Sequence, residues 1–157
     1  MAISASKFQR TVSGIARGGA SGTGLLLNAD TLKLALYTDA TAPDAASDLV
    51  YAATLTGGCA EVGSGNGYTT TGNTCGAGIT SNSTGTETLR TTSNPTAWTA
   101  SSSGFSMRYF ILYDSTASSA LANLLMYWDY GSTLPLSGAN GDTLTVTGPA
   151  TSYATLA

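Results

Sequence analysis

Two long apolar runs in the C-terminal third of the chain constrain its fold more than any other feature. The first, FSMRYFILYD (105–114), alternates in the manner of a strand, and the second, ALANLLMYWDYG (120–131), follows after a short polar loop. Successive strand residues point to opposite faces of a sheet, so a period of two in both runs predicts two strands. A short connection between consecutive strands favours antiparallel pairing. We therefore predict a hairpin at the centre of the core, with one face of its first strand formed by Phe105, Met107, Tyr109, Ile111 and Tyr113.

Shorter strand patterns surround this hairpin. Residues 31–38 alternate cleanly, Thr-rich runs occupy 86–92 and 95–101, and further alternation follows at 143–147 and 153–157. Asn140–Gly141 is the dipeptide preferred in a type I′ turn. Short strands separated by Gly-rich turns are typical of β-sandwiches. The sequence thus predicts an all-β fold, an antiparallel β-sandwich of jelly-roll-like type, formed by residues 31–157.

Residues 1–30 form a different segment, an N-terminal arm. Phe8, Val12 and Ile15 recur at helical spacing within residues 4–17, and a Gly-rich connection, 18–24, follows. We expect a short helix or an extended arm here, stabilised mainly by what it packs on. Residues 1–33 carry a net charge of +3, whereas the rest of the chain carries −6. A basic arm of this kind docks on acidic surfaces, and its four spaced cations favour a protein surface over nucleic acid.

Charge is scarce in the whole chain. Thr, Ser, Ala and Gly make up 87 of the 157 residues, and charged residues make up only 10%. Ordinary soluble domains carry about 25% charged residues, so this composition favours a protein that packs against neighbours, although secreted β-proteins share it. The polar first 24 residues lack the apolar region of a secretory signal, and no run of 18 apolar residues is present. We therefore expect neither secretion nor membrane insertion.

The side chains needed for most enzyme chemistry are missing. The chain has no histidine, which removes the usual general base near neutral pH and the commonest metal ligand. The Gly-rich stretch GSGNG (63–67) lacks the lysine and helix of a phosphate loop, and is interpreted as a tight turn. Asp114 and Asp129 lie on the two predicted hairpin strands, where capping of backbone amides is favoured over glycosidase chemistry. We expect no enzyme activity, no cofactor and no metal.

Two further groups of residues leave alternatives open. Cys59 and Cys75 flank a turn-like stretch, so they could form a disulfide, although two separate buried thiols are the favoured interpretation. Aromatic side chains gather in the two hairpin runs and could form a sugar-stacking platform, but aromatics at alternating strand positions more often belong to a core. The aromatic residues concerned are Tyr109, Tyr113, Tyr127, Trp128 and Tyr130.

Six stretches follow one another in a characteristic order along the chain: KF…VSGIA near the start, TLKLALYTDATAP (31–43), EVGSGNGYTTTGNT (61–74), FSMRYFILYDSTA (105–117), LLMYWDYGS (124–132) and NGDTLTV (140–146). This order resembles that of a widespread family of tailed-bacteriophage virion proteins. The family has an N-terminal helix followed by LKxAL, GNGYT, RYxxLY, WDYG and NGDxxTV motifs. The chain departs from the family pattern in its two cysteines and in a Gly-rich insert after the predicted helix.

The resemblance implies a structural protein of the phage particle, assembled in the host cytoplasm. We expect a capsid decoration or cement protein that binds the major capsid protein and itself, as a trimer before a dimer, without contacting nucleic acid. A tail-tube, neck or fibre component and a carbohydrate-binding host-recognition module are the alternatives. The residues expected to contact the capsid or a sister subunit are Lys7, Phe8, Arg10, Val12, Ile15 and Arg17. For Phe8, Val12 and Ile15, packing on the protein's own sandwich is the competing interpretation.

Overall fold

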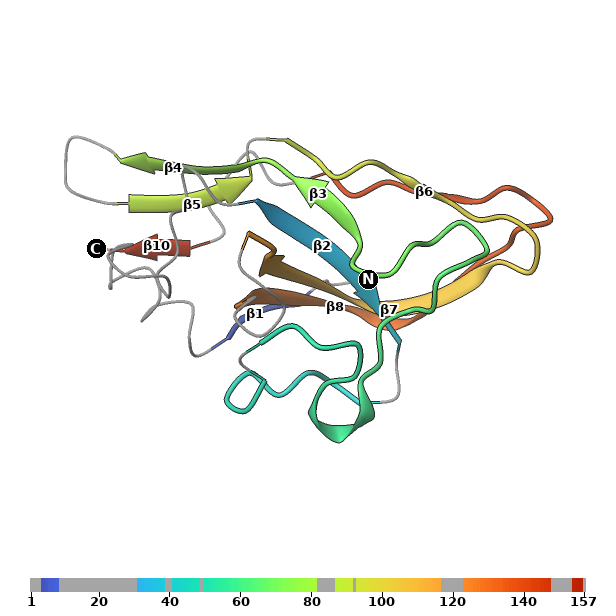
Figure 1. The fold of residues 1–157 in the computed structure, drawn as a ribbon, viewed down its shortest axis with the longest axis horizontal. Coiled ribbons are helices and arrows are strands. Elements are labelled where there is room, and N and C mark those ends of the chain that lie inside the picture. Colours follow the sequence, from blue (N-terminus) through green and yellow to red (C-terminus); the bar gives the residue numbers. More distant parts are fainter. Residues whose placement is uncertain are drawn as a thin grey trace.

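The structure is a computed structural model that describes residues 4–8, 31–38, 41–48, 50–81, 87–91, 93–116, 123–147 and 154–156. Its strands are β1 (Ser4–Lys7), β2 (Leu32–Tyr37), β3 (Asn73–Cys75), β4 (Ala77–Ser81), β5 (Glu87–Thr91), β6 (Trp98–Thr99), β7 (Phe105–Asp114), β8 (Leu124–Leu136), β9 (Thr143–Leu144) and β10 (Ala154–Leu156). They form a five-stranded sheet in the order β1-β8-β7-β2-β3, a three-stranded sheet β10-β5-β4 and the pair β6-β9 (Figure 1). Every pairing is antiparallel, which confirms the predicted all-β, sandwich-like fold.

The predicted central hairpin is formed by β7 and β8, but its faces differ from the prediction. Tyr109 pairs with Asp129 whereas Met107 pairs with Leu134, so β8 contains extra residues between these two pairs. Gly131 lies inside this irregularity with a φ of +91°, in the left-handed region that glycine tolerates best. Across this irregularity Phe105 and Met107 pack in the same cluster as Phe110 and Leu112, and do not share a face with Tyr109.

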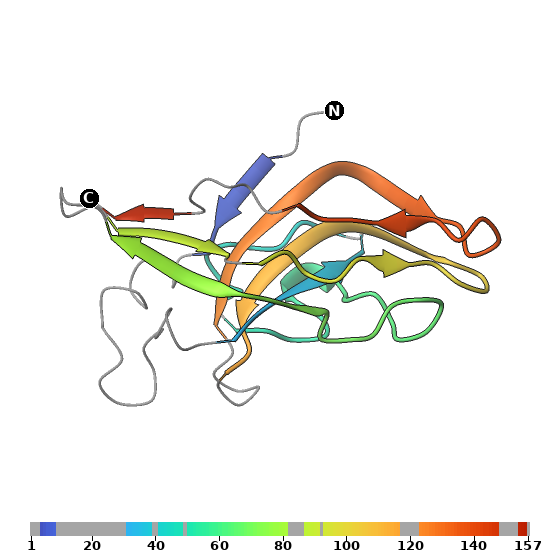
Figure 2. The ribbon, with the colours of Figure 1, turned by 90° about the horizontal axis from the view of Figure 1, so that it is seen from above.

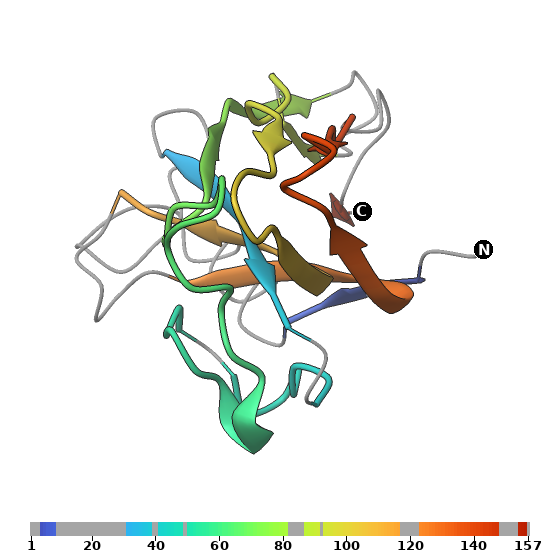
Figure 3. The ribbon, with the colours of Figure 1, turned by 90° about the vertical axis from the view of Figure 1, so that its right-hand side faces the viewer.

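Both faces of the five-stranded sheet are covered. On one face, leucines of β2 and residues of β7 and β8 pack beneath Val62, Tyr68 and Trp98. On the other, Tyr37, Tyr109 and Ile111 pack against residues of the 41–60 segment, including Leu55 and Cys59. Figure 3 shows this segment on one side of the sheet and the β6–β9 pair on the other. Double coverage explains why both faces of β7 are apolar, where a solvent-facing strand would alternate with polar residues.

Of the two forms expected for the N-terminal residues, a short helix or an extended arm, the described residues take the extended one. Ser4–Lys7 is strand β1, which pairs with Met126–Asp129 of β8 at the edge of the sheet (Figure 2). Phe8 continues this pairing through its backbone N–H, which donates to the Leu125 carbonyl at 3.1 Å. The helical spacing was misleading because Phe8 is fixed by a long-range strand pairing, which outweighs a weak local preference. The rest of the predicted helix, residues 9–17, lies outside the described residues.

A type I′ turn is present, but not at the dipeptide for which it was predicted. Asn66 and Gly67 have φ values of +54° and +97°. Gly65 and Tyr68 exchange both backbone hydrogen bonds around them, at 2.8 and 3.0 Å. This geometry is a two-residue hairpin turn, and it confirms that GSGNG is a tight turn. At Asn140–Gly141 only Gly141 has a positive φ, of +63°, so that turn is not type I′.

Candidate functional site

The six residues predicted to contact a partner separate into three groups. Lys7 is exposed at the edge of the sheet. Phe8 is only 1% exposed and its ring lies 5.5 Å from that of Tyr127, so it belongs to the protein's own core. For Phe8, therefore, the structure supports own-core packing, the interpretation that competed with partner contact. The remaining four, Arg10, Val12, Ile15 and Arg17, lie outside the described residues.

The described surface carries few charges. Among the residues whose exposure the structure describes, Lys7 and Asp44 are the only charged residues that are fully exposed, and Lys33, Arg108, Asp129 and Asp142 are partly exposed. Nearly all the other exposed residues are Thr, Ser, Gly or Ala. Three acidic residues, Asp48, Glu61 and Asp114, are instead buried. The surface therefore carries even fewer charges than the composition indicates, because the fold buries three carboxyl groups.

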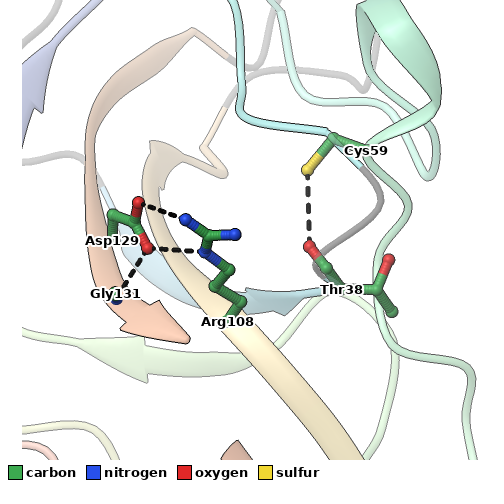
Figure 4. A network of polar contacts seen from close by, with 5 residues as sticks. All are labelled: Thr38, Cys59, Arg108, Asp129 and Gly131. Atoms are coloured by element: carbon green, nitrogen blue, oxygen red, sulfur yellow. Dashed lines mark hydrogen bonds and ion pairs between the residues drawn. The ribbon is translucent and has the colours of Figure 1, made fainter. Parts of the chain in front are cut away.

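Cys59 and Cys75 are separate buried thiols, and the possible disulfide between them is not formed. Cys59 lies in the cluster beneath the 41–60 segment, whereas Cys75 lies in the cluster on the opposite face of the sheet. The Cys59 thiol is 3.9 Å from the Thr38 carbonyl, as Figure 4 shows. Burial raises the pKa of Cys59 to about 12 and that of Cys75 to about 11, so both stay protonated and unreactive at neutral pH.

Among the described residues, an extensive polar cluster is centred on Glu61, which was not among the residues predicted to form a site. Its Oε1 accepts hydrogen bonds from the Tyr68 hydroxyl at 2.6 Å and the Thr71 backbone N–H at 2.7 Å. Its Oε2 accepts a short hydrogen bond from the Tyr51 hydroxyl. Glu61 is 8% exposed, and all three donors come from its own chain. A lone acid in a Thr- and Gly-rich stretch, seven residues before a tyrosine, is the only sequence signal for this cluster.

The tyrosines around Glu61 extend the cluster to the sheet. The Tyr68 hydroxyl also accepts a hydrogen bond from the Leu36 N–H at 3.1 Å, and the Tyr113 hydroxyl donates to the Thr71 carbonyl at 2.7 Å. The rings of Tyr51 and Tyr113 stack with centroids 4.3 Å apart. Burial, and then the bond to Glu61, raise the pKa of Tyr51 and Tyr68 far above its ordinary value. These phenols therefore act as fixed donors, which suits a structural clamp better than proton transfer.

A second polar group lies at the irregularity of β8. Arg108 Nε donates to Asp129 Oδ1 at 2.8 Å and its Nη2 donates to Oδ2 at 3.0 Å, a bidentate pair (Figure 4). Asp129 Oδ1 also accepts the Gly131 N–H at 2.7 Å, which holds the bulge in place. The hydrogen bonds from Arg108 hold the pKa of Asp129 below its usual range. Since the two side chains are 30% and 23% exposed, this pair fixes local geometry and adds little stability.

The remaining candidates for chemistry are used within the fold. Asp114 Oδ1 accepts the Thr116 N–H at 2.9 Å, so both hairpin aspartates cap backbone amides, as predicted. Tyr109 and Tyr113 are 1% and 3% exposed, which assigns these two to the core and not to a sugar-stacking platform. Within the described ranges, no three Cys, Asp or Glu side chains gather as metal ligands, and no helix is long and apolar enough to span a membrane.

A shallow hollow lies on the 41–60 segment, with Asp48 and Leu55 among its lining residues. The Asp48 carboxyl group already accepts the backbone N–H groups of Asp44 and Thr56, at 2.7 and 2.8 Å. Its acceptor capacity is therefore largely used by the turn that it holds, and the hollow offers no set of converging groups for a ligand.

Comparison with protein-family models, with curated proteins and with solved structures finds no match to this chain.

Proposed function

We propose that the protein is a structural component of a tailed-phage virion, a capsid decoration protein that binds the lattice of the major capsid protein. The observation that supports the proposal is the charge-poor surface. Among the residues whose exposure is described, only Lys7 and Asp44 are charged and fully exposed, and four more charged residues are partly exposed. A soluble monomer generally needs a mixed charged surface to avoid association. A Thr-, Ser- and Gly-rich surface can be buried against protein neighbours without the cost of removing charges from water.

The internal use of the acidic groups supports the same role. Glu61 and Asp129 hold loops and the β8 bulge through hydrogen bonds within the chain. Such side chains stabilise a rigid body, which is what a protein that fastens other subunits together requires. The motif order at 61–74 and 105–132 adds the resemblance to virion proteins.

Binding to capsids tests the proposal directly. Purified protein is added to expanded capsids that lack it, and bound copies and capsid disruption temperature are measured. The proposal expects saturable binding with a raised disruption temperature, and absence of binding would contradict it. Quantitative mass spectrometry of virions separates head from tail roles, because hundreds of copies fit the shell or tail tube and few fit a neck or fibre.

The contribution of the N-terminal arm needs charge substitutions, because deleting residues 1–20 would remove β1 and the buried Phe8. Reversing Lys7, Arg10 and Arg17 to Glu leaves Phe8 in place. If the basic arm contacts an acidic capsid surface, this variant loses affinity and its residual binding no longer depends on salt. Lys33→Glu is the control, because it reverses a charge on strand β2 and leaves the arm unchanged. If the arm variant, the control and the parent protein bind capsids with equal affinity, the arm is not the contact.

A further inference from the structure

The chain contains two Asn–Gly dipeptides on exposed turns, and the fold places them in different surroundings. In such a dipeptide the glycine backbone nitrogen can attack the asparagine side-chain carbon Cγ. A bond from nitrogen to Cγ forms, the Cγ–NH₂ bond breaks, and ammonia leaves with the glycine N–H proton. Water then opens the resulting succinimide at either carbonyl and gives aspartate or isoaspartate. The reaction needs only water, but ring closure requires rotation of the peptide group after asparagine, so the turn has to open.

At Asn66–Gly67 this rotation is opposed by three sets of contacts. The Asn66 carbonyl accepts the Ser101 N–H at 2.9 Å, and the flanking Gly65 and Tyr68 are joined by two backbone hydrogen bonds. A Cβ atom at Gly67 would lie 1.9 Å from the Thr99 carbonyl oxygen, so the turn is pressed against a neighbouring segment. Tyr68 is 2% exposed and its hydroxyl is bonded to Glu61, which anchors the chain directly after the turn.

At Asn140–Gly141 the surroundings are open. Both residues are exposed, and a Cβ atom at Gly141 would meet nothing within 4 Å. The Gly141 N–H donates a long hydrogen bond of 3.2 Å to the Gly138 carbonyl, and the Asp142 N–H donates one of 3.1 Å to the Ser137 carbonyl. Among the described residues no hydrogen bond reaches the Asn140 carbonyl, and no neighbouring segment packs against Gly141 itself, so rotation of the Asn140–Gly141 peptide group meets less resistance than at Asn66.

We propose that Asn140 is a site of spontaneous deamidation in the folded protein, and that the fold protects Asn66 from the same reaction. The product places a new carboxylate two residues before Asp142, whose carboxyl group accepts the Ser137 N–H at 2.8 Å. It adds one negative charge to a chain of net charge −3. The new charge lies on a surface where, among the residues whose exposure is described, only Lys7 and Asp44 are charged and fully exposed.

Peptide mapping of the aged full-length protein tests this inference. Protein is incubated in mildly alkaline buffer, either folded or unfolded in urea, and both dipeptides are quantified by mass spectrometry with separation of isoaspartate. In the folded protein Asn140 should react about ten-fold faster than Asn66. The hydrogen bond from the Ser101 N–H to the Asn66 carbonyl has to break before the peptide group can rotate, and the free energy of one such bond corresponds to a rate factor of about ten. In urea the difference should shrink to within about two-fold, since the protecting contacts are gone.

Three results would overturn the inference. The first is equal or faster reaction at Asn66 in the folded protein. The second is an Asn140 that stays intact when folded but reacts in urea. The third is a ten-fold difference that persists in urea, because it would show that local sequence and not the fold sets the rates. Asn140→Ser provides the control, since it should abolish the modified peptide from this turn while leaving the rate at Asn66 unchanged.

Discussion

The hydrogen bonds of Glu61 allow a direct test of how the loop residues Tyr51, Tyr68 and Thr71 are held against the five-stranded sheet. Glu61→Ala removes the acceptor for the Tyr51 and Tyr68 hydroxyls and for the Thr71 N–H. Loss of three hydrogen bonds to a buried carboxyl group, partly offset because that group no longer has to be desolvated, should lower the free energy of unfolding by about 3 kcal/mol. For a domain of this size that corresponds to a fall in Tm of roughly 10 °C.

Glu61→Gln should lower the free energy of unfolding less than Glu61→Ala, because the two carboxylate oxygens have different partners. Tyr68 and Thr71 both donate to Oε1, so an amide whose oxygen takes that position keeps these two bonds. Only the contact to the half-buried Tyr51 changes, because an NH₂ group now faces its hydroxyl. This variant should lose about 1 kcal/mol.

Urea unfolding followed by tryptophan fluorescence measures these differences. Tyr68→Phe should cost more than Tyr51→Phe, because Tyr68 is buried and its hydroxyl also serves the Leu36 N–H. Tyr130→Phe, a half-buried tyrosine outside the cluster, is the matched control and should change stability by less than about 0.5 kcal/mol. The reasoning is refuted if Glu61→Ala costs under about 1 kcal/mol, or if Glu61→Gln costs as much as Glu61→Ala.

Three further predictions concern single positions. Gly67→Ala should destabilise by at least about 2 kcal/mol because the new methyl group meets backbone, whereas Gly63→Ala, with open space, should be nearly neutral in the same urea titration. Asp129→Asn should lower stability by about 1 kcal/mol near neutral pH. Because the folded pKa of Asp129 is depressed, this contribution is present above its unfolded pKa and fades as pH falls through the folded value, so Tm of variant and parent should converge in acid; a constant gap would contradict the assignment. Cys59 and Cys75 should resist a thiol reagent in the native protein and react at once in denaturant, and fast native labelling would show that they are not buried.

The sequence by itself determined the class of fold and its centre. Two long apolar runs, 105–114 and the one that follows, are joined by a short polar loop, and this arrangement is enough to predict a hairpin. The scarcity of charged residues likewise follows from composition and needs no coordinates. The capping role of Asp114 was also predictable, since aspartate at a strand end readily accepts backbone N–H groups. Asp129 caps the Gly131 N–H in the interior of β8, which only the structure shows.

Only the tertiary structure decided what depends on contacts between distant parts of the chain. The strand Ser4–Lys7 and the burial of Phe8 are fixed by β8, more than a hundred residues away in the chain, so helical spacing at the N-terminus carried too little information. Met107 lies on the other face from Tyr109 across the irregularity between β7 and β8. Gly131 is a local signal for a bulge, but the register on either side of it depends on the partner strand. Glu61 became the centre of a polar cluster because Tyr51 and Tyr68 converge on it through folding. The two Asn–Gly turns are identical as dipeptides, and they differ because one is packed against Thr99 and the other faces open space.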